Sequence, residues 1–181
     1  MKEVFRHDYD LVRKALAGDR YAFEEVVNRY QSQVAKTVIA MLGNTAEAED
    51  TGQEVFIRFF RSMKQFEGDS SLGTYLTRIA INLSLNELKK RKTKPSEDID
   101  DHGYRLTSDD QFRRSETADM INRALQQLEP EFRSVVVLRM IHGYSSEETA
   151  KILGIATGTV LSRLSRARLK LRNIISREME N

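Results

Sequence analysis

The sequence SEETAKILGIATGTVLSRLSRARLKLR, residues 146–172, decides the fold that we expect for the C-terminal part of this chain. It predicts a first helix over residues 147–153, which Ser145 or Ser146 can cap with a side-chain hydroxyl group. Gly154 follows directly, where the turn to a second helix requires a residue that tolerates positive φ. A short helix, a glycine turn and a second helix are typical of a helix-turn-helix.

The second helix, which begins at Thr157 or Gly158, is amphipathic. Apolar residues recur at steps of three and four positions and predict one buried face: Val160, Leu164, Ala167, Leu171 and Ile174. Between residues 156 and 177 the other positions carry cations and no acidic residue: Arg163, Arg166, Arg168, Lys170, Arg172 and Arg177. A helix in the DNA major groove reads bases with its first turns and contacts phosphates with its basic flanks. We therefore interpret this helix as DNA-binding, with a solvated amphipathic helix as the alternative.

The distribution of charge supports that interpretation more than the net charge does. The 181 residues suffice for one large or two small domains, and the formal net charge is only +2. Residues 93–119 carry four basic and eight acidic residues, whereas residues 120–181 carry ten basic and six acidic residues. A basic end behind an acidic connector suggests a nucleic-acid-binding module on a tether.

Metal, disulfide and membrane sites are not expected. The chain has no cysteine, and its histidines, His7, His102 and His142, are too scattered to have the spacing of zinc ligands. We therefore expect no metal site and no cofactor. The N-terminal sequence MKEVFRHDYD lacks the apolar core of a signal peptide, and no apolar run reaches membrane-spanning length. A cytoplasmic protein is the simplest expectation.

Helical periodicity extends over most of the chain, and strand patterns are nearly absent. We expect an all-α fold with two small helical domains, residues 1–94 and 116–181, joined by a flexible acidic linker over residues 95–115. In the first domain the pattern predicts helices over 10–17, 21–42 and 46–65, a polar loop over 68–73, and a helix from Thr74 or Tyr75 to about residue 92. In the second, helices resume near Ser115, and Pro130 begins an almost wholly apolar helix that we place at the centre of a second core.

The helix that ends near residue 92 has a distinct polar face. Arg78, Asn82, Asn86 and Lys89 recur along it at intervals of three or four residues. Amides and cations on one helix face can bind phosphates and the polar edges of unstacked bases. A solvated face whose C-terminal lysines complement the helix dipole explains the same pattern.

Three stretches, in order along the chain, resemble the extracytoplasmic-function sigma factors, which are promoter-specificity subunits of bacterial RNA polymerase. AEDTGQEVFIRFF, residues 48–60, resembles their region 2, and FEGDSSLGTYLTRIAINLSLNELKKRK, residues 66–92, resembles their promoter-opening segment. LEPEFRSVVVLRMIHGYSSEETAKILGIATGTVLSRLSRAR, residues 128–168, resembles their region 4. The resemblance implies a non-catalytic protein that binds core polymerase, recognises the −35 and −10 promoter elements and helps to open the DNA. It also implies an anti-sigma factor as a further partner.

The resemblance implies a role for particular residues. Asp50, Gln53 and Glu54 match the helix that docks on the clamp coiled coil of the largest polymerase subunit. The residues that match the −10 contacts, where a base flips out of the stack, are Phe66, Ser70, Ser71, Tyr75, Arg78, Asn82, Asn86 and Lys89. For the −35 element they are Thr159, Ser162, Arg163, Arg166, Arg168 and Lys170. Phe66 can equally be a core residue.

The chain departs from the family pattern at four positions. Tyr75 stands where the family usually has tryptophan, Leu161 where it has a basic residue, and Ala156 where it has proline. Gly52 interrupts the helix that is expected to dock on the clamp, where a glycine costs about 1 kcal/mol relative to alanine. The departures at Tyr75 and Leu161 alter the expected −10 and −35 contacts, and Ala156 loosens the turn.

Two other function classes compete with the sigma factor. A stand-alone helix-turn-helix regulator would bind duplex DNA as a dimer, without polymerase. An enzyme that acts on nucleic acid would need clustered carboxylates or a positioned base. Asp98, Asp100 and Asp101 are clustered, but they lie in the segment that we expect to be unstructured. The sequence therefore favours the sigma factor.

Overall fold

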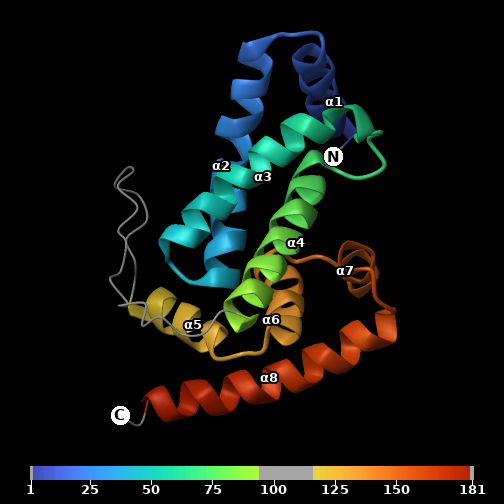
Figure 1. Cartoon of the computed structure of the whole chain (residues 1–181). Helices are drawn as coiled ribbons and strands as arrows, with labels where there is room; N and C mark the ends of the chain where they lie inside the picture. The colour runs from blue at the N-terminus through green and yellow to red at the C-terminus, as the bar shows by residue number, and fades with distance from the viewer. Residues whose placement is uncertain (1, 94–115, 180–181) are drawn as a thin grey trace.

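The computed structural model describes residues 2–93 and 116–179, and all of the regular elements in these two ranges are helices (Figure 1). The first range holds α1 (Lys2–Leu16), α2 (Arg20–Leu42), α3 (Ala46–Ser62) and α4 (Leu72–Thr93), and the second holds α5 (Glu116–Gln126), α6 (Pro130–Val136), α7 (Ser146–Leu153) and α8 (Thr157–Met179). A 3-10 turn, η1 (Met63–Gln65), follows α3, and a π-helical turn, η2 (Val137–Ile141), follows α6. The expected all-α fold is confirmed. The acidic linker over 95–115 lies outside the described residues.

Two predicted helix starts were wrong. Helix α1 begins at Lys2 rather than near residue 10, since neither glycine nor proline interrupts the chain before Gly18. Helix α4 begins at Leu72, because the Ser71 hydroxyl oxygen accepts a hydrogen bond from the backbone N–H of Thr74 at 3.0 Å and so caps the helix early. The segment that was expected to be a loop up to residue 73 therefore includes the first turn of α4.

The other predicted boundaries follow local signals and agree with the structure. Asp19 caps α2 by accepting hydrogen bonds from the N–H groups of Tyr21 and Ala22 at 3.0 and 3.2 Å. Thr45 caps α3 through the N–H of Ala48 at 3.3 Å. Helices α3 and α4 both pack along α2, and α1 covers its N-terminal part (Figure 1).

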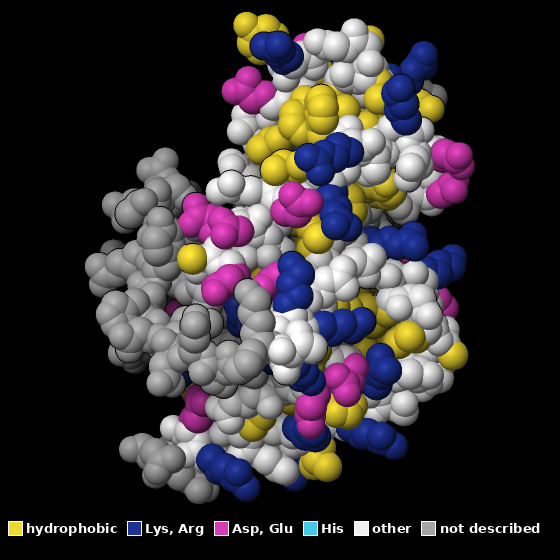
Figure 2. Space-filling model, in the orientation of Figure 1, with side chains coloured by type: hydrophobic (Ala, Val, Ile, Leu, Met, Phe, Trp, Pro, Cys, Tyr) yellow, Lys and Arg dark blue, Asp and Glu magenta, His cyan; other side chains and the backbone are white. Residues whose placement is uncertain are grey.

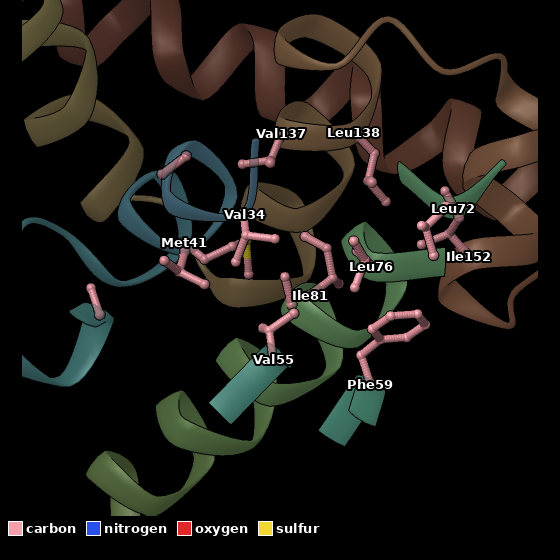
Figure 3. Close-up of a cluster of buried hydrophobic side chains, with 14 of the residues drawn as sticks. Val34, Met41, Val55, Phe59, Leu72, Leu76, Ile81, Val137, Leu138 and Ile152 are labelled. Atoms are coloured by element: carbon pink, nitrogen blue, oxygen red, sulfur yellow. The ribbon is translucent and has the colours of Figure 1, made fainter. Parts of the chain in front are cut away.

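The largest group of buried side chains joins both halves of the chain. Figure 3 shows Val55, Phe59, Leu76 and Ile81 directed into the same region as Val137 and Leu138 from the segment after α6. A smaller separate cluster consists of Val135, Ala150, Val160 and Leu164. The helix after Pro130 was expected at the centre of a second core, and its Val135 lies in the smaller cluster. Val136 also reaches the larger cluster, because an apolar helix can bury two faces.

A polar junction holds α5 and α6 against the C-terminal end of α2. The guanidinium of Arg133, which is only 5% exposed, donates hydrogen bonds to the backbone carbonyl groups of Met41, Gln126 and Leu128 and to the Gln126 side chain. The Gln126 amide in turn donates to the carbonyl group of Ala40 at 3.1 Å. The last carbonyl groups of a helix have no partner within it, so α2 is capped from the other half of the chain.

A second polar contact lies one turn earlier on α2. The Thr37 hydroxyl donates to the Gln33 carbonyl group at 2.8 Å, so its oxygen can accept a hydrogen bond from His142 Nε2 at 2.9 Å. Burial, and then the charge of Lys36, lower the pKa of His142 below its usual value. We refer to the contacts of Arg133, Gln126 and His142 with α2 as the junction.

Candidate nucleic-acid and protein interfaces

The helix-turn-helix has the geometry that its sequence predicts. Ser145, rather than Ser146, caps α7: its hydroxyl oxygen accepts from the N–H of Glu148 at 3.1 Å, and the Glu148 carboxylate accepts from the N–H of Ser145 at 2.7 Å. Gly154 then takes the left-handed conformation, with φ +65°. Ala150 is buried in the cluster that joins α7 to α8, where a small side chain permits a close helix crossing.

Helix α8 separates apolar and basic faces. Val160, Leu164 and Ala167 are buried, while Leu171 and Ile174 are half-buried, so the predicted apolar face is confirmed. On the opposite side three arginines are exposed and have no hydrogen-bond or ion-pair partner within residues 2–93 and 116–179: Arg166, Arg168 and Arg172. Figure 2 shows Lys and Arg side chains along the lower part of the molecule, where Figure 1 places α8. This surface can receive a polyanion.

The other expected −35 residues have more restricted surroundings. Ser162 is exposed, and its hydroxyl donates to the carbonyl group of Thr159 at 3.0 Å. Thr159 and Arg163 are half-buried at the start of α8. The ammonium of Lys170 lies 2.5 Å from the Glu129 carboxylate and 4.9 Å from the centroid of the Phe132 ring. Lys170 therefore joins α8 to the start of α6, a structural contact that its sequence position did not indicate.

The polar face of α4 is accessible. Arg78, Asn82, Asn86 and Lys89 are all exposed, and in the described part of the chain no hydrogen bond or ion pair engages their side chains. Amide and cationic groups on one rigid helix can contact phosphates and base edges without first breaking an internal interaction.

The loop before α4 is less accessible than this face. Phe66 is only 8% exposed and meets Tyr75 edge to face, with ring centroids 5.3 Å apart. Tyr75 is half-buried, lies edge to face with Phe59 as well, and donates a hydrogen bond from its hydroxyl to Ser62 at 3.3 Å. The interpretation of Phe66 as a core residue agrees with this burial. Ser70 and Ser71 are half-buried: the Ser70 hydroxyl donates to the Ser71 carbonyl group, and the Ser71 hydroxyl contacts that of Thr74 in α4.

The third surface lies on α3. Asp50 and Gln53 are exposed, and Glu54 is half-buried and accepts a hydrogen bond from the Nε of Arg58 at 3.3 Å. The exposed face continues beyond them with Ile57, 44% exposed, and Phe60, 57% exposed.

The apolar period of α3 predicts a core side made of Val55, Phe56, Phe59, Phe60 and Met63, and for Phe60 that prediction is wrong. Phe59 is fully buried, and adjacent helical residues point about 100° apart, so Phe60 is directed outward. It packs instead against Phe23, with ring centroids 5.2 Å apart at the surface. Figure 2 shows hydrophobic side chains gathered in the upper part of the molecule, near α3 in Figure 1.

A cleft that the sequence did not predict opens beside the junction. Its volume is about 660 Å³, and its lining includes Arg29 and Lys36 from α2, Thr74 from α4, and His142. Arg29 is paired with the buried Asp8 carboxylate at 2.9 Å. Within the described residues no group of three His, Asp or Glu side chains could hold a metal ion. None of the described helices is both long and apolar enough to cross a membrane.

Comparison with known proteins places both halves of this chain in one family. The family model for Sigma-70 region 2 matches residues 26–94, and that for Sigma-70, region 4, matches residues 118–171. The chain is 34% identical to the ECF RNA polymerase sigma factor SigM of Mycobacterium tuberculosis, over 94% of this chain and 85% of the relative. It is 33% identical to the ECF RNA polymerase sigma-E factor of Escherichia coli, over 92% of this chain and 93% of the relative.

Two solved structures are similar in fold. The sigma factor RpoE from Bartonella quintana, crystallised with the anti-sigma factor NepR, aligns with a TM-score of 0.67 and 25% identity, over 85% of this chain and 96% of that one. CnrH, in complex with the cytosolic domain of CnrY, aligns with a TM-score of 0.66 and 22% identity, over 94% and 97% of the two chains. The helix arrangement seen here is therefore shared with those proteins.

Proposed function

This chain belongs to the extracytoplasmic-function sigma factors of the sigma-70 family, and we propose that its three exposed helix faces divide the work of such a factor. A sigma factor binds core RNA polymerase and directs transcription initiation at specific promoters. We assign polymerase binding to α3, the −10 element to α4 and the −35 element to α8. The observation that carries the assignment is that the polar side chains of one α4 face, and Arg166, Arg168 and Arg172 on α8, are exposed and unpaired in the described structure.

The −35 element is the duplex that we assign to α8. Ser162 and Arg166 lie on its exposed side near the start, where a recognition helix meets base edges, and Arg168 lies half a turn further along. Thr159 and Arg163 flank these residues. Lys170 is left out of the binding surface, because its contact with Glu129 and Phe132 already occupies it.

The melted −10 strand is the ligand that we assign to α4. Asn82 and Asn86 offer amide donors and acceptors to bases, and Arg78 and Lys89 offer cations to phosphates. Ser70 and Ser71 lie directly before the N-terminus of the same helix. A stacking role for Phe66 or Tyr75 would require their edge-to-face contact to open, at the cost of core packing.

Core polymerase is the partner that we assign to α3. Asp50, Gln53 and Glu54 form an acidic and amide-rich face on a rigid helix, which is complementary to a basic partner helix. The domain limits of this arrangement are residues 1–94 for the polymerase and −10 functions, 95–115 for the linker and 116–181 for the −35 function.

We infer further that the factor acts without catalysis of its own and works in the cytoplasm, with the polymerase and the chromosome. A negative regulator is part of the proposal. The similar structures RpoE and CnrH were solved as complexes, one of them with a named anti-sigma factor. An anti-sigma factor, anchored at the membrane or not, would bind this chain with one-to-one stoichiometry.

The test is binding of the purified chain to bacterial core RNA polymerase. The variant Asp50→Ala, Gln53→Ala, Glu54→Ala is expected to lose most of its affinity. A matched control, Asp10→Ala, Glu24→Ala, Gln31→Ala, removes the same three side-chain types from exposed positions on α1 and α2 and should bind like the wild type. Equal binding by both variants would remove the assignment of α3. No binding by the wild type, together with a dimer in solution, would favour the stand-alone regulator.

A further inference from the structure

Leu161 is an unusual residue to find exposed on α8. It lies one turn into the helix, between the buried Val160 and the exposed Ser162, and its side chain is 54% exposed. It belongs to neither of the two hydrophobic clusters. A single exposed leucine is ordinary on a protein surface. Here, however, it occupies the part of a recognition helix that meets base edges, where a charged or polar side chain would serve solubility better.

The surface around Leu161 leaves room for a base to approach. Gly158 lies one turn before it, and a Cβ atom built on that glycine would meet no other atom within 4 Å. Ser165, one turn after it, is small and exposed. The leucine therefore projects from a strip of α8 with small residues on both sides, and nothing in the described structure covers it.

The chemistry of the major groove gives such a side chain one specific target. Guanine, adenine and cytosine present hydrogen-bonding groups at their major-groove edges, whereas thymine also presents its C5-methyl group. The leucine side chain cannot donate or accept a hydrogen bond. It can pack against the thymine methyl group, which removes the apolar surface of both groups from water. We propose that Leu161 is a specificity-determining residue of this factor, which selects thymine in the upstream duplex through its C5-methyl group.

This proposal rests on the proposed function of α8, and it assigns affinity and base discrimination to different residues of that helix. Arg166 and Arg168 hold the helix on the DNA through phosphate or guanine contacts, and Leu161 adds discrimination at one base pair. Leu169 provides an internal comparison, because it is similarly exposed, at 57%, but lies eight residues further along. At 1.5 Å per residue that is about 12 Å along the helix axis, beyond the turns that enter the groove.

Uracil offers a direct test, since it differs from thymine only by lacking the C5-methyl group. The holoenzyme of this chain with core polymerase would first select upstream sequences from a randomised duplex library. Each thymine of the selected sequence, on either strand, would then be replaced by uracil. We expect one position at which uracil weakens binding about fourfold, the effect of one buried methylene equivalent. At that position Leu161→Ala should bind the two duplexes equally, whereas Leu169→Ala should still discriminate.

A second variant, Leu161→Arg, should change the base preference instead of abolishing it. In a repeated selection, Leu161→Arg should shift the preferred base at the same position from thymine to guanine, which an arginine contacts through O6 and N7. If the wild type selects a sequence but no uracil substitution matters, or if Leu161→Ala still discriminates, the proposal is wrong. If the holoenzyme selects no upstream sequence, the proposed function of α8 itself is wrong, and the proposed role of Leu161 is then wrong as well.

Discussion

Arg133 at the junction and Arg166 on α8 are both arginines, but the first is buried and the second is exposed. Arg133 is 5% exposed, and its two terminal nitrogens hydrogen-bond to three backbone carbonyl groups and one side-chain amide. Arg166 is exposed and has no partner among the described residues. The first arginine completes the fold, because it donates to carbonyl groups at or near helix ends inside the protein. The second is available to a ligand, since no internal contact must break before it binds.

The buried arginine also shows how a charge can be accommodated without a carboxylate. Burial, and then the neighbouring charge of Arg91, lower the pKa of Arg133 to about 10, so it remains charged at neutral pH. The carbonyl groups that surround it include those at the C-terminal end of α2, where the helix dipole is negative. That end therefore acts as the counter-charge, and the cation ties α6 to it.

Replacing Arg133 should produce the largest effect. In Arg133→Met, the carbonyl groups of Met41 and Leu128 lose a charged donor while they remain inside the protein. We expect the free energy of unfolding to fall by about 3 kcal/mol. Urea denaturation followed by circular dichroism measures this change. Arg168→Met, on the exposed face of α8, is the control and should change stability by less than about 0.5 kcal/mol. A similarly small effect for Arg133→Met would mean that the junction is not structural.

Replacing Arg166 should produce the reverse pattern. Arg166→Ala should unfold like the wild type within about 0.5 kcal/mol, since its side chain is exposed and has no partner in the described structure. Its holoenzyme should bind an upstream promoter duplex roughly 10- to 100-fold more weakly, which corresponds to the loss of about 1–3 kcal/mol. Fluorescence anisotropy at two salt concentrations measures both the affinity and its salt dependence. Arg20→Ala, an exposed arginine at the start of α2, should leave DNA binding unchanged.

The sequence alone could predict most of the helices, because their signals are local. Asp19, Ser145 and Gly154 act within a few residues of the helix ends that they define, and in the structure each of them lies at such an end. The apolar period of α8 is local in the same way. The start of α1 was missed, since no strong cap or breaker marks it and helix ends are the least certain part of such predictions.

The junction could not be predicted, because its contacts join residues far apart in the chain. Arg133 and Met41 are separated by 92 residues, and nothing in the sequence near either one indicates the other. The same limit explains the candidate DNA surfaces. Sequence could place Lys170 among the cations of α8, but only the fold shows that Glu129, 41 residues earlier, engages it. Which members of a basic helix remain available for DNA is a property of packing.

The smallest expected effect concerns the other polar contact of the junction, between His142 and Thr37. The pKa of His142 is lowered in the folded chain, so below pH 6.5 the unfolded chain binds more protons at this position than the folded one. The contribution of His142 to stability is therefore complete above pH 6.5 and declines as the pH falls from there towards the folded pKa. Asp8, Arg29, Lys36 and Tyr144 also line the cleft beside it.

Unfolding in urea at pH 7.5, 6.5 and 5.5 tests this dependence. The wild type should lose stability over that range, and His142→Gln should lose less, because a glutamine amide can still donate to Thr37 but does not titrate. The carboxyl groups whose pKa values are lowered, such as that of Glu47, lose their contribution only near pH 4.5 and below, outside this window. An equal slope for the wild type and His142→Gln would mean that His142 is not held neutral at the junction. The polar contacts of Arg133 and Gln126 with α2 would then be the part of the junction that contributes to stability.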